Sequence, residues 1–195
     1  MKNGNAGMFE RDRCCLLVID VQQHFLNKLP LDQREPLVQR IAWLMRVARL
    51  LEIPIVATAE EITRVGPLVP ELTSELPKGA TVRNKMVLGL MGQPDIAAAV
   101  AATGRDQFVL TGLETDVCVS QSAFGLEAAG YRPAVIDDAC ATPPPHHDYA
   151  LRRLRDAGIA VLSLKGIYYE WVRDLATLAR IEPKMNQPLP AGMTL

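Results

Sequence analysis

Cys118 is the residue of this chain whose type and position best suit nucleophilic chemistry. It follows the strand predicted for residues 107–113 by five positions and lies near the first turn of the helix predicted for 116–129. Unpartnered backbone N–H groups and the helix dipole favour a thiolate at such a position, so we expect a lowered thiol pKa. The position alone leaves a buried structural cysteine open as the alternative.

Two charged residues are candidates to act with this sulfur. Asp20 closes the apolar run of residues 16–19, so its carboxylate is expected to point out of a sheet, with a capping or turn role as the alternative. Lys85 follows the strand predicted for 80–84, and its four-carbon stem can cross one neighbouring strand. Because most lysines are simply exposed to solvent, the candidacy of Lys85 depends on the other two residues.

The hydrophobic pattern predicts the elements that position these residues. Apolar runs alternate with stretches of helical period, and the runs are apolar on both faces, as in parallel strands covered by helices on each side. Strands are predicted at residues 14–20, 53–58, 80–84, 107–113, 133–137 and 159–164, and helices at about 33–51, 94–103, 116–129, 147–157 and 167–180. The expected fold class is α/β, a three-layer α/β/α doubly wound sheet of six mainly parallel strands in the order 3-2-1-4-5-6.

Ligands of doubly wound sheets bind beyond the carboxyl ends of the strands, where the winding reverses. In the expected order this crevice lies between the first and fourth strands, so Asp20 and the segment that leads to Cys118 should meet there. Residues 60–79 contain Gly66 and three prolines and should form a long loop with one helical turn at 69–72. Loops of that length are usually lids or pocket walls.

One domain is expected for residues 1–195, with residues 1–12 and 183–195 as terminal arms. The 21 basic and 22 acidic residues give a net charge of -1, so no basic excess drives binding to nucleic acid. The longest apolar run, 96–102, is far shorter than the roughly 20 residues that span a bilayer, and residues 1–7 do not resemble a signal peptide. We therefore expect a cytoplasmic protein with no nucleic-acid or membrane partner.

The four cysteines have neither metal-ligand spacing nor the density of a disulfide scaffold, so free thiols are expected. Cys14 and Cys15 are adjacent in a predicted strand and should face opposite sides as buried thiols. Cys140 is expected in the loop after the fifth strand, as structural filler.

Three segments carry a resemblance to a known family. They are LVIDVQ at residues 17–22, Lys85, and GLETDVCV at residues 112–119, of which the last is the most specific. Together they resemble the isochorismatase-like cysteine hydrolases. Two further matches, GPLVPEL at 66–72 and DDA at 137–139, extend the resemblance over about residues 14–175, and the first is similar to the YcaC-type subgroup of uncharacterised hydrolases.

The resemblance implies a catalytic triad of Asp20, Lys85 and Cys118. It also implies a cis peptide between Leu113 and Glu114, with an oxyanion hole formed by the backbone N–H groups of Glu114 and Cys118. In the implied mechanism the aspartate takes the thiol proton, the lysine holds the negative charges together, and the thiolate attacks a carbonyl carbon. The expected function is hydrolysis of a small amide-like C–N bond through a thioester, without a metal or cofactor.

Departures from the family narrow this function. Nicotinamidases of the family bind a metal through an acidic residue and histidines after the second strand, but residues 58–64 read TAEEITR and no histidine lies between His24 and His146. A nicotinamidase-type metal site is therefore not expected. True isochorismatases cleave a vinyl ether and lack the nucleophilic cysteine, so its presence favours an amide or related acyl substrate.

The weaker expectations concern the pocket and the partners. His24 and Phe25 follow Asp20 closely and His146 begins a helix, so these three are candidates for the substrate pocket, with local packing as the alternative. The resemblance implies homo-oligomers from dimers to octamers, and the apolar face of the helix predicted for 167–180 suits a subunit contact. The competing function is a non-hydrolytic small-molecule-binding or thiol-redox protein that keeps the fold.

Overall fold

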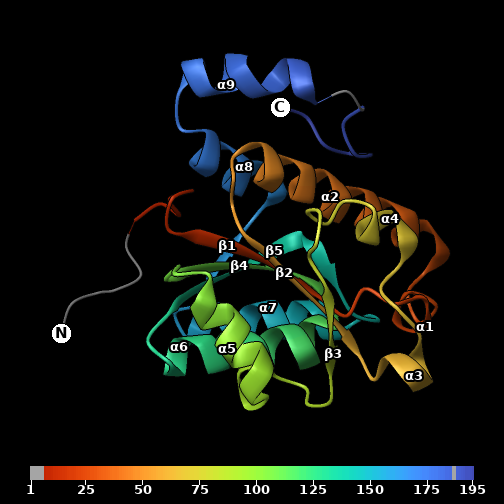
Figure 1. Ribbon diagram of the computed structural model, residues 1–195. Coiled ribbons are helices and arrows are strands. Elements are labelled where there is room, and N and C mark those ends of the chain that lie inside the picture. The colour runs from red at the N-terminus through yellow and green to blue at the C-terminus, as the bar shows by residue number, and fades with distance from the viewer. Residues whose placement is uncertain (1–6, 186–187) are drawn as a thin grey trace.

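Six strands form one parallel sheet in the order β3-β2-β1-β4-β5-β6, as the sequence predicts (Figure 1). The computed structural model describes residues 7–185 and 188–195. The strands are β1 (Cys14–Ile19), β2 (Ile55–Glu60), β3 (Val82–Lys85), β4 (Gln107–Leu113), β5 (Arg132–Ala141) and β6 (Ala160–Leu162). The winding reverses between β1 and β4, which places a crevice at the carboxyl ends of these two strands.

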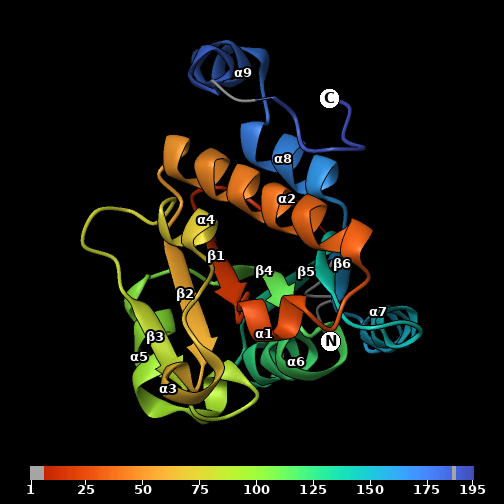
Figure 2. The ribbon, with the colours of Figure 1, turned by 90° about the vertical axis from the view of Figure 1, so that its right-hand side faces the viewer.

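Helices cover both faces of the sheet and give the three predicted layers (Figures 1 and 2). One face carries α2 (Leu31–Leu50), α4 (Pro70–Thr73) and α8 (Leu164–Val172), with α9 (Leu175–Ile181) beyond them. The other face carries α5 (Pro94–Ala102), α6 (Ser120–Ala128) and α7 (His146–Asp156). The short elements are α1 (Gln23–Leu26), α3 (Ile62–Val65), η1 (Leu90–Gly92), the π-helical turn η2 (Thr115–Val119) and η3 (Glu182–Lys184).

Successive side chains of β1 point to opposite faces of the sheet and so belong to two separate parts of the core. Every residue of this strand is fully buried, because helices lie on both sides of the sheet. Cys14 belongs to the apolar cluster beneath α2 and α8, whereas Cys15 belongs to the cluster beneath α5 and α6. The prediction that these two thiols face opposite sides is confirmed.

Most predicted boundaries shift by a few residues, and two differences change the kind of element that a residue belongs to. The helix predicted for 167–180 is two helices, because Arg173 has a φ of 66° and ends α8. Asp174 then caps α9 by accepting a hydrogen bond from the N–H of Thr177 at 2.7 Å. Cys140 lies in β5 and not in a loop, because that strand continues past a register shift to Ala141.

The predicted terminal arms are only partly described: residues 1–6 and 186–187 lie outside the described residues. Phe9 is 1% exposed and packs beneath the guanidinium of Arg132 at 4.0 Å. The chain is therefore attached to the domain from this residue onward. Within the described ranges, none of the helices combines the length and the apolar character that crossing a bilayer requires.

Candidate active site

Asp20 stands at the carboxyl end of β1 and is fully buried. Its backbone has a φ of 52°, a left-handed conformation that aspartate tolerates better than most residues and that occurs often at functional sites. Thr58 of β2 holds it twice, because its carbonyl accepts from the Asp20 N–H at 3.1 Å and its hydroxyl donates to Oδ1 at 2.9 Å. The second carboxylate oxygen is left to face the rest of the cluster.

Lys85 ends β3 and is also fully buried, although it carries an ammonium group. The ammonium meets three acceptors: Oδ2 of Asp20 at 2.9 Å, the carbonyl of Val87 at 2.6 Å and Sγ of Cys118 at 3.5 Å. Since an ammonium has three N–H donors, this set can satisfy all of them. The side chain spans β2, which lies between β3 and β1, as the sequence predicts.

The turn that follows β4 presents Cys118. The peptide between Leu113 and Glu114 is cis, in agreement with the resemblance. The carbonyl of Glu114 accepts from the N–H groups of Val117 and Val119 at 3.1 and 3.2 Å, which closes the π-helical turn η2. Cys118 lies in this turn and is 3% exposed.

Gly112 lets β4 approach β1 at this edge of the sheet. It has a φ of 121°, and a Cβ atom there would stand 2.0 Å from the carbonyl oxygen of Ile19. Only glycine fits, because the obstructing atoms belong to backbone. The close approach brings the end of β1, where Asp20 lies, near the turn that carries Cys118.

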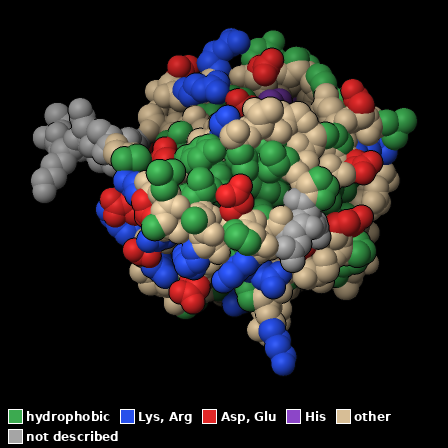
Figure 3. All heavy atoms as spheres, turned by 90° about the horizontal axis from the view of Figure 1, so that it is seen from above, with side chains coloured by type: hydrophobic (Ala, Val, Ile, Leu, Met, Phe, Trp, Pro, Cys, Tyr) green, Lys and Arg blue, Asp and Glu red, His purple; other side chains and the backbone are tan. Residues whose placement is uncertain are grey.

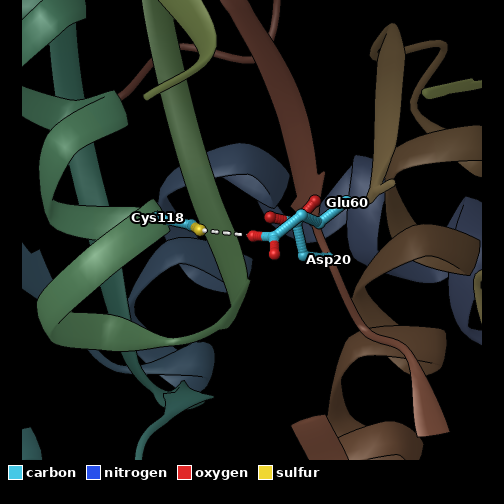
Figure 4. Close-up of side chains that lie close together, drawn as sticks. All are labelled: Asp20, Glu60 and Cys118. Atoms are coloured by element: carbon cyan, nitrogen blue, oxygen red, sulfur yellow. Dashed lines mark hydrogen bonds between the residues drawn. The ribbon is translucent and has the colours of Figure 1, made fainter. Parts of the chain in front are cut away.

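Glu60 is a fourth member of the cluster that the sequence reasoning missed (Figure 4). It ends β2, and its Oε2 accepts from the thiol of Cys118 at 3.6 Å and lies 3.8 Å from Nζ of Lys85. Figure 4 shows the side chains of Asp20, Glu60 and Cys118 pointing toward one another. Its position after a predicted strand beside that of Asp20 is a signal for it, but the sequence places Glu60 only at the start of the loop predicted for residues 60–79, with no sign of a contact with the sulfur.

Burial governs the ionisation of this cluster. It raises the pKa of the Asp20 carboxyl, and the positive charge of Lys85 opposes that effect only in part. Burial lowers the pKa of Lys85, but the charges of Asp20, Cys118 and Glu60 outweigh it, so that the net shift is upward. The pKa of the Cys118 thiol is raised by burial first and by the charge of Asp20 second.

The prediction of a lowered thiol pKa is therefore wrong. A short turn beside the sulfur supplies a weak dipole, whereas nearly complete burial and two carboxylates both disfavour a thiolate. Burial and the neighbouring carboxylates thus favour the neutral thiol over the thiolate at Cys118.

Asp20, Glu60 and Cys118 each offer a ligand atom, and these atoms lie within 4.8 Å of one another. A cation at their centre would compete with the ammonium of Lys85, which is already 2.9 Å from Asp20 and 3.5 Å from the sulfur. The donor set thus suits an internal ammonium better than a resident metal ion, because a second positive charge there would be repelled.

The three predicted pocket residues differ in their surroundings. His24 is exposed and packs edge-on against the largely buried Phe25, with ring centroids 5.2 Å apart, and His146 is exposed at the start of α7. Among the described residues, no hydrogen bond or ion pair joins any of them to Cys118. The neighbouring His147 contacts the turn η2, which carries Cys118, since its Nδ1 lies 2.9 Å from the hydroxyl of Thr115.

A cavity of about 410 Å³ lies between the first half of α2, the end of β5 and the start of α7. Its lining includes Arg40, Asp138, Thr142 and His147, but Cys118 is not among the residues that line it. His147 thus lines this cavity and also contacts the turn that carries the sulfur, and its Nε2 lies 3.2 Å from Asp137.

The doubly wound sheet, the cis peptide after β4 and the buried cysteine, lysine and aspartate define an α/β protein of the isochorismatase-like class. The family described as the isochorismatase domain matches residues 14–165. The chain therefore belongs to the isochorismatase family and is a hydrolase of that family.

Several relatives resemble the chain over most of its length. The probable hydrolase YcaC of Escherichia coli is 26% identical over 179 residues, which cover 88% of this chain and 86% of that protein. Isochorismatase domain-containing protein 2 of Bos taurus is 29% identical over 90% of this chain and 84% of its own. The structure of YcaC from Pseudomonas aeruginosa with hexane-2,5-diol and covalent acrylamide is 26% identical, with a TM-score of 0.79, and covers 92% of this chain and 94% of that one.

The structure of E. coli YcaC is described as an octameric hydrolase of unknown specificity. It is 25% identical to this chain and has a TM-score of 0.79, and the match covers 91% of this chain and 92% of that one. These similarities confirm the likeness to the YcaC-type subgroup that the sequence indicates.

Proposed function

We propose that the chain is a cysteine-dependent amidohydrolase that cleaves a small amide-like C–N bond without a metal. The observation that carries this proposal is the distance of 3.5 Å between Sγ of Cys118 and Nζ of Lys85, whose ammonium also pairs with Asp20 at 2.9 Å. A nucleophile, a proton acceptor and a fixed positive charge thus meet in one buried place, which is the arrangement that covalent acyl transfer needs.

The proposed reaction begins with the neutral thiol. As the sulfur attacks the carbonyl carbon, its proton passes to Asp20, and Lys85 stabilises the negative charge that moves between the two groups. The carbonyl oxygen becomes an oxyanion, for which the N–H groups of Glu114 and Cys118 are the proposed donors. Asp20 then protonates the leaving amine or ammonia, and the acyl group stays on the sulfur as a thioester.

Hydrolysis of the thioester completes the cycle. Water enters after the amine has left, and the Asp20 carboxylate takes a proton from it as it attacks the thioester carbonyl. The products are a carboxylic acid and the free thiol. The raised pKa of Asp20 suits both roles, because a carboxyl that accepts and returns a proton near neutral pH works best when its pKa lies close to that pH.

The relatives support this proposal without defining the substrate. One is named a probable hydrolase, and another was crystallised with covalent acrylamide, a small amide. By analogy we propose that a small amide can reach the sulfur of Cys118 in this chain. The pocket walls are not assigned, and His24, Phe25 and His146 stay predictions.

We further propose a homo-oligomer. The octameric E. coli relative supports it, and so does the face seen from above in Figure 3, where hydrophobic side chains gather over α8 and α9. A cavity of about 400 Å³ opens there, and Leu175 of α9 is 82% exposed. The cavity is lined by Trp43, Tyr168, Tyr169, Leu178, Glu182, Met185, Leu189 and Leu195. Sedimentation that gives a stable monomer at micromolar concentration would contradict this.

Ammonia release tests the proposed activity. We expect at least one member of a panel of small primary amides to give ammonia in a coupled assay, and Cys118→Ala to abolish that release. If the whole panel is inert and Cys118 undergoes only reversible oxidation, the thiol-redox alternative is favoured. The four cysteines are free thiols, as the sequence predicts.

A further inference from the structure

The carboxylate of Glu60 lies at the boundary between the buried cluster and solvent. The side chains of Asp20 and Lys85 are fully buried and Cys118 is 3% exposed, whereas the side chain of Glu60 is 19% exposed. Among these four, Glu60 is therefore the one that reaches the surface. A small molecule that approaches the sulfur from this side must pass its carboxylate, which is 3.6 Å from Sγ.

The backbone of Glu60 is held in place from both sides. Gln22, which is fully buried, donates from Nε2 to the carbonyl of Glu60 at 2.8 Å and accepts from its N–H at 2.7 Å. The same Nε2 also donates to the carbonyl of Gly66 at 2.6 Å, which ties the following loop to this point. On the other side Glu60 pairs with Lys85 in the register of β2 and β3. The carboxylate is thus aimed by fixed backbone and not by a mobile loop.

The charges of the cluster do not cancel. The carboxylate of Asp20 and the ammonium of Lys85 form a pair, and the thiol is neutral, so the charge of Glu60 remains in excess. Arg64 offers only weak compensation, because it lies 4.0 Å from Oε1 and is 61% exposed to solvent. A ligand at the sulfur therefore meets a net negative charge.

We propose that Glu60 is a specificity-determining residue that selects substrates with an ammonium group one or two carbon atoms from the scissile carbonyl. Its Oε2 accepts a hydrogen bond from that ammonium while the carbonyl carbon rests on Sγ, since the two protein atoms are 3.6 Å apart. Substrates with a carboxylate at the same place are rejected by like charge. The preference among substrates rests on the proposed amidohydrolase function. The selection by charge does not, because it applies to any small reagent that reaches the sulfur.

The first test needs no substrate. Methanethiosulfonates that carry an aminoethyl, a sulfonatoethyl or a methyl group differ in charge, and each forms a mixed disulfide with a thiolate and releases methanesulfinate. For each reagent, the rate constant with Cys118 is divided by the rate constant of the same reagent with a free thiol, and the result is expressed relative to that of the neutral reagent. At low ionic strength we expect the ratio of these normalised rates, cationic to anionic, to be at least about tenfold. Glu60→Gln should reduce this ratio about tenfold, and Cys118→Ala gives the background.

Glu61→Gln is the matched control, because it removes the same charge from the next residue. The carboxylate of Glu61 accepts from Nε of Arg64 at 2.5 Å and has no contact with the sulfur among the described residues. We expect this variant to keep the ratio of the native protein. An equal fall in Glu60→Gln and Glu61→Gln, or no fall in either, would overturn the inference.

The second test uses turnover of glycinamide, propionamide and malonamate, which differ in charge beside the carbonyl. The native protein should favour glycinamide over propionamide in kcat/KM, and Glu60→Gln should lower the ratio of these two kcat/KM values by about tenfold, whatever its rate on propionamide alone. A native preference for malonamate overturns the inference. If no amide is hydrolysed but the thiol keeps its preference for the cationic reagent, the proposed reaction fails and the charge selection stands.

Discussion

Removal of the Lys85 ammonium gives a direct test of how the buried cluster is held together. Lys85→Met keeps a side chain of similar length but leaves Asp20 buried without its ion-pair partner, and it deprives the carbonyl of Val87 of a donor at 2.6 Å. Breaking a buried ion pair from one side costs about 3–5 kcal/mol, because a charge then stays in the interior uncompensated. We expect a loss of that size in the free energy of unfolding at pH 8.

Urea unfolding followed by circular dichroism measures the loss, with Lys28→Met as the control. Lys28 also pairs with a carboxylate, that of Glu114 at 2.9 Å, but its side chain is 42% exposed. Exposed pairs contribute about 0–1 kcal/mol, so the control variant should unfold close to the native protein. If the two lysine variants lose the same stability, the pair with Asp20 is not what holds the cluster.

The pH dependence follows from the direction of the Asp20 shift. Its pKa in the folded protein is raised above the ordinary value of 3.8, and without Lys85 the rise is larger, because the main opposing charge is gone. The folded state then binds more protons than the unfolded state between these two values, so its stability falls as pH rises through that window. The loss in Lys85→Met should therefore be smaller at pH 5 than at pH 8.

The double variant Asp20→Asn with Lys85→Met refines the test. It removes both charges, so it should be more stable than Lys85→Met alone, although it lacks the ion pair. A double variant no more stable than Lys85→Met would refute the explanation by uncompensated charge. The loss of stability in Lys85→Met would then come from altered packing of this side chain across β2.

Four further outcomes are expected. Cys118→Ser should lower ammonia release by a factor on the order of 10⁶, measured as kcat on the best amide of the panel. Alkylation of Cys118 by the neutral reagent iodoacetamide should still accelerate above pH 9.0, the ordinary thiol pKa, because burial raises that pKa; a plateau below pH 8 would contradict the structure. Gly112→Ala should fail to give folded protein. Gly104→Ala is the control, because Gly104 also has a positive φ, of 66°, but nothing lies within 4 Å of the new Cβ. This variant should fold and lose about 1–2 kcal/mol in the free energy of unfolding, measured in urea. His147→Ala should lower kcat more than it raises KM, because it removes the contact with the catalytic turn at 2.9 Å and not a substrate contact.

The sequence predicts the two central strands, β1 and β4, most directly, because every residue of both is buried. Parallel strands covered on both faces are largely apolar, so residues 14–19 and 107–113 stand out without any knowledge of the fold. Polar residues at the ends of such strands must then lie at one edge. This is enough to bring Asp20 and the segment that leads to Cys118 together before any distance is known, whereas the assignment of Lys85 to the same place depends on the resemblance to the family.

Other features depend on tertiary surroundings that periodicity does not encode. The break between α8 and α9 lies at Arg173, a residue with no special preference for a positive φ. The contact of Glu60 with the sulfur depends on how Gln22 fixes the end of β2, which is a contact between residues 38 positions apart. The thiol pKa was predicted with the wrong sign, because a local rule about helix ends ignored the burial of the whole cluster.

The ionisation of the cluster explains how a buried thiol with a raised pKa can still act as a nucleophile. Loss of the Cys118 proton to solvent would add a second uncompensated negative charge beside Glu60, and burial makes that costly. Transfer of the same proton to Asp20 leaves the total charge unchanged, because one carboxylate is neutralised as one thiolate forms. Lys85 contacts both groups, at 2.9 and 3.5 Å, so it stabilises the negative charge before and after the transfer. In the proposed mechanism the sulfur therefore stays protonated in the free protein, and the thiolate forms as it attacks a bound carbonyl.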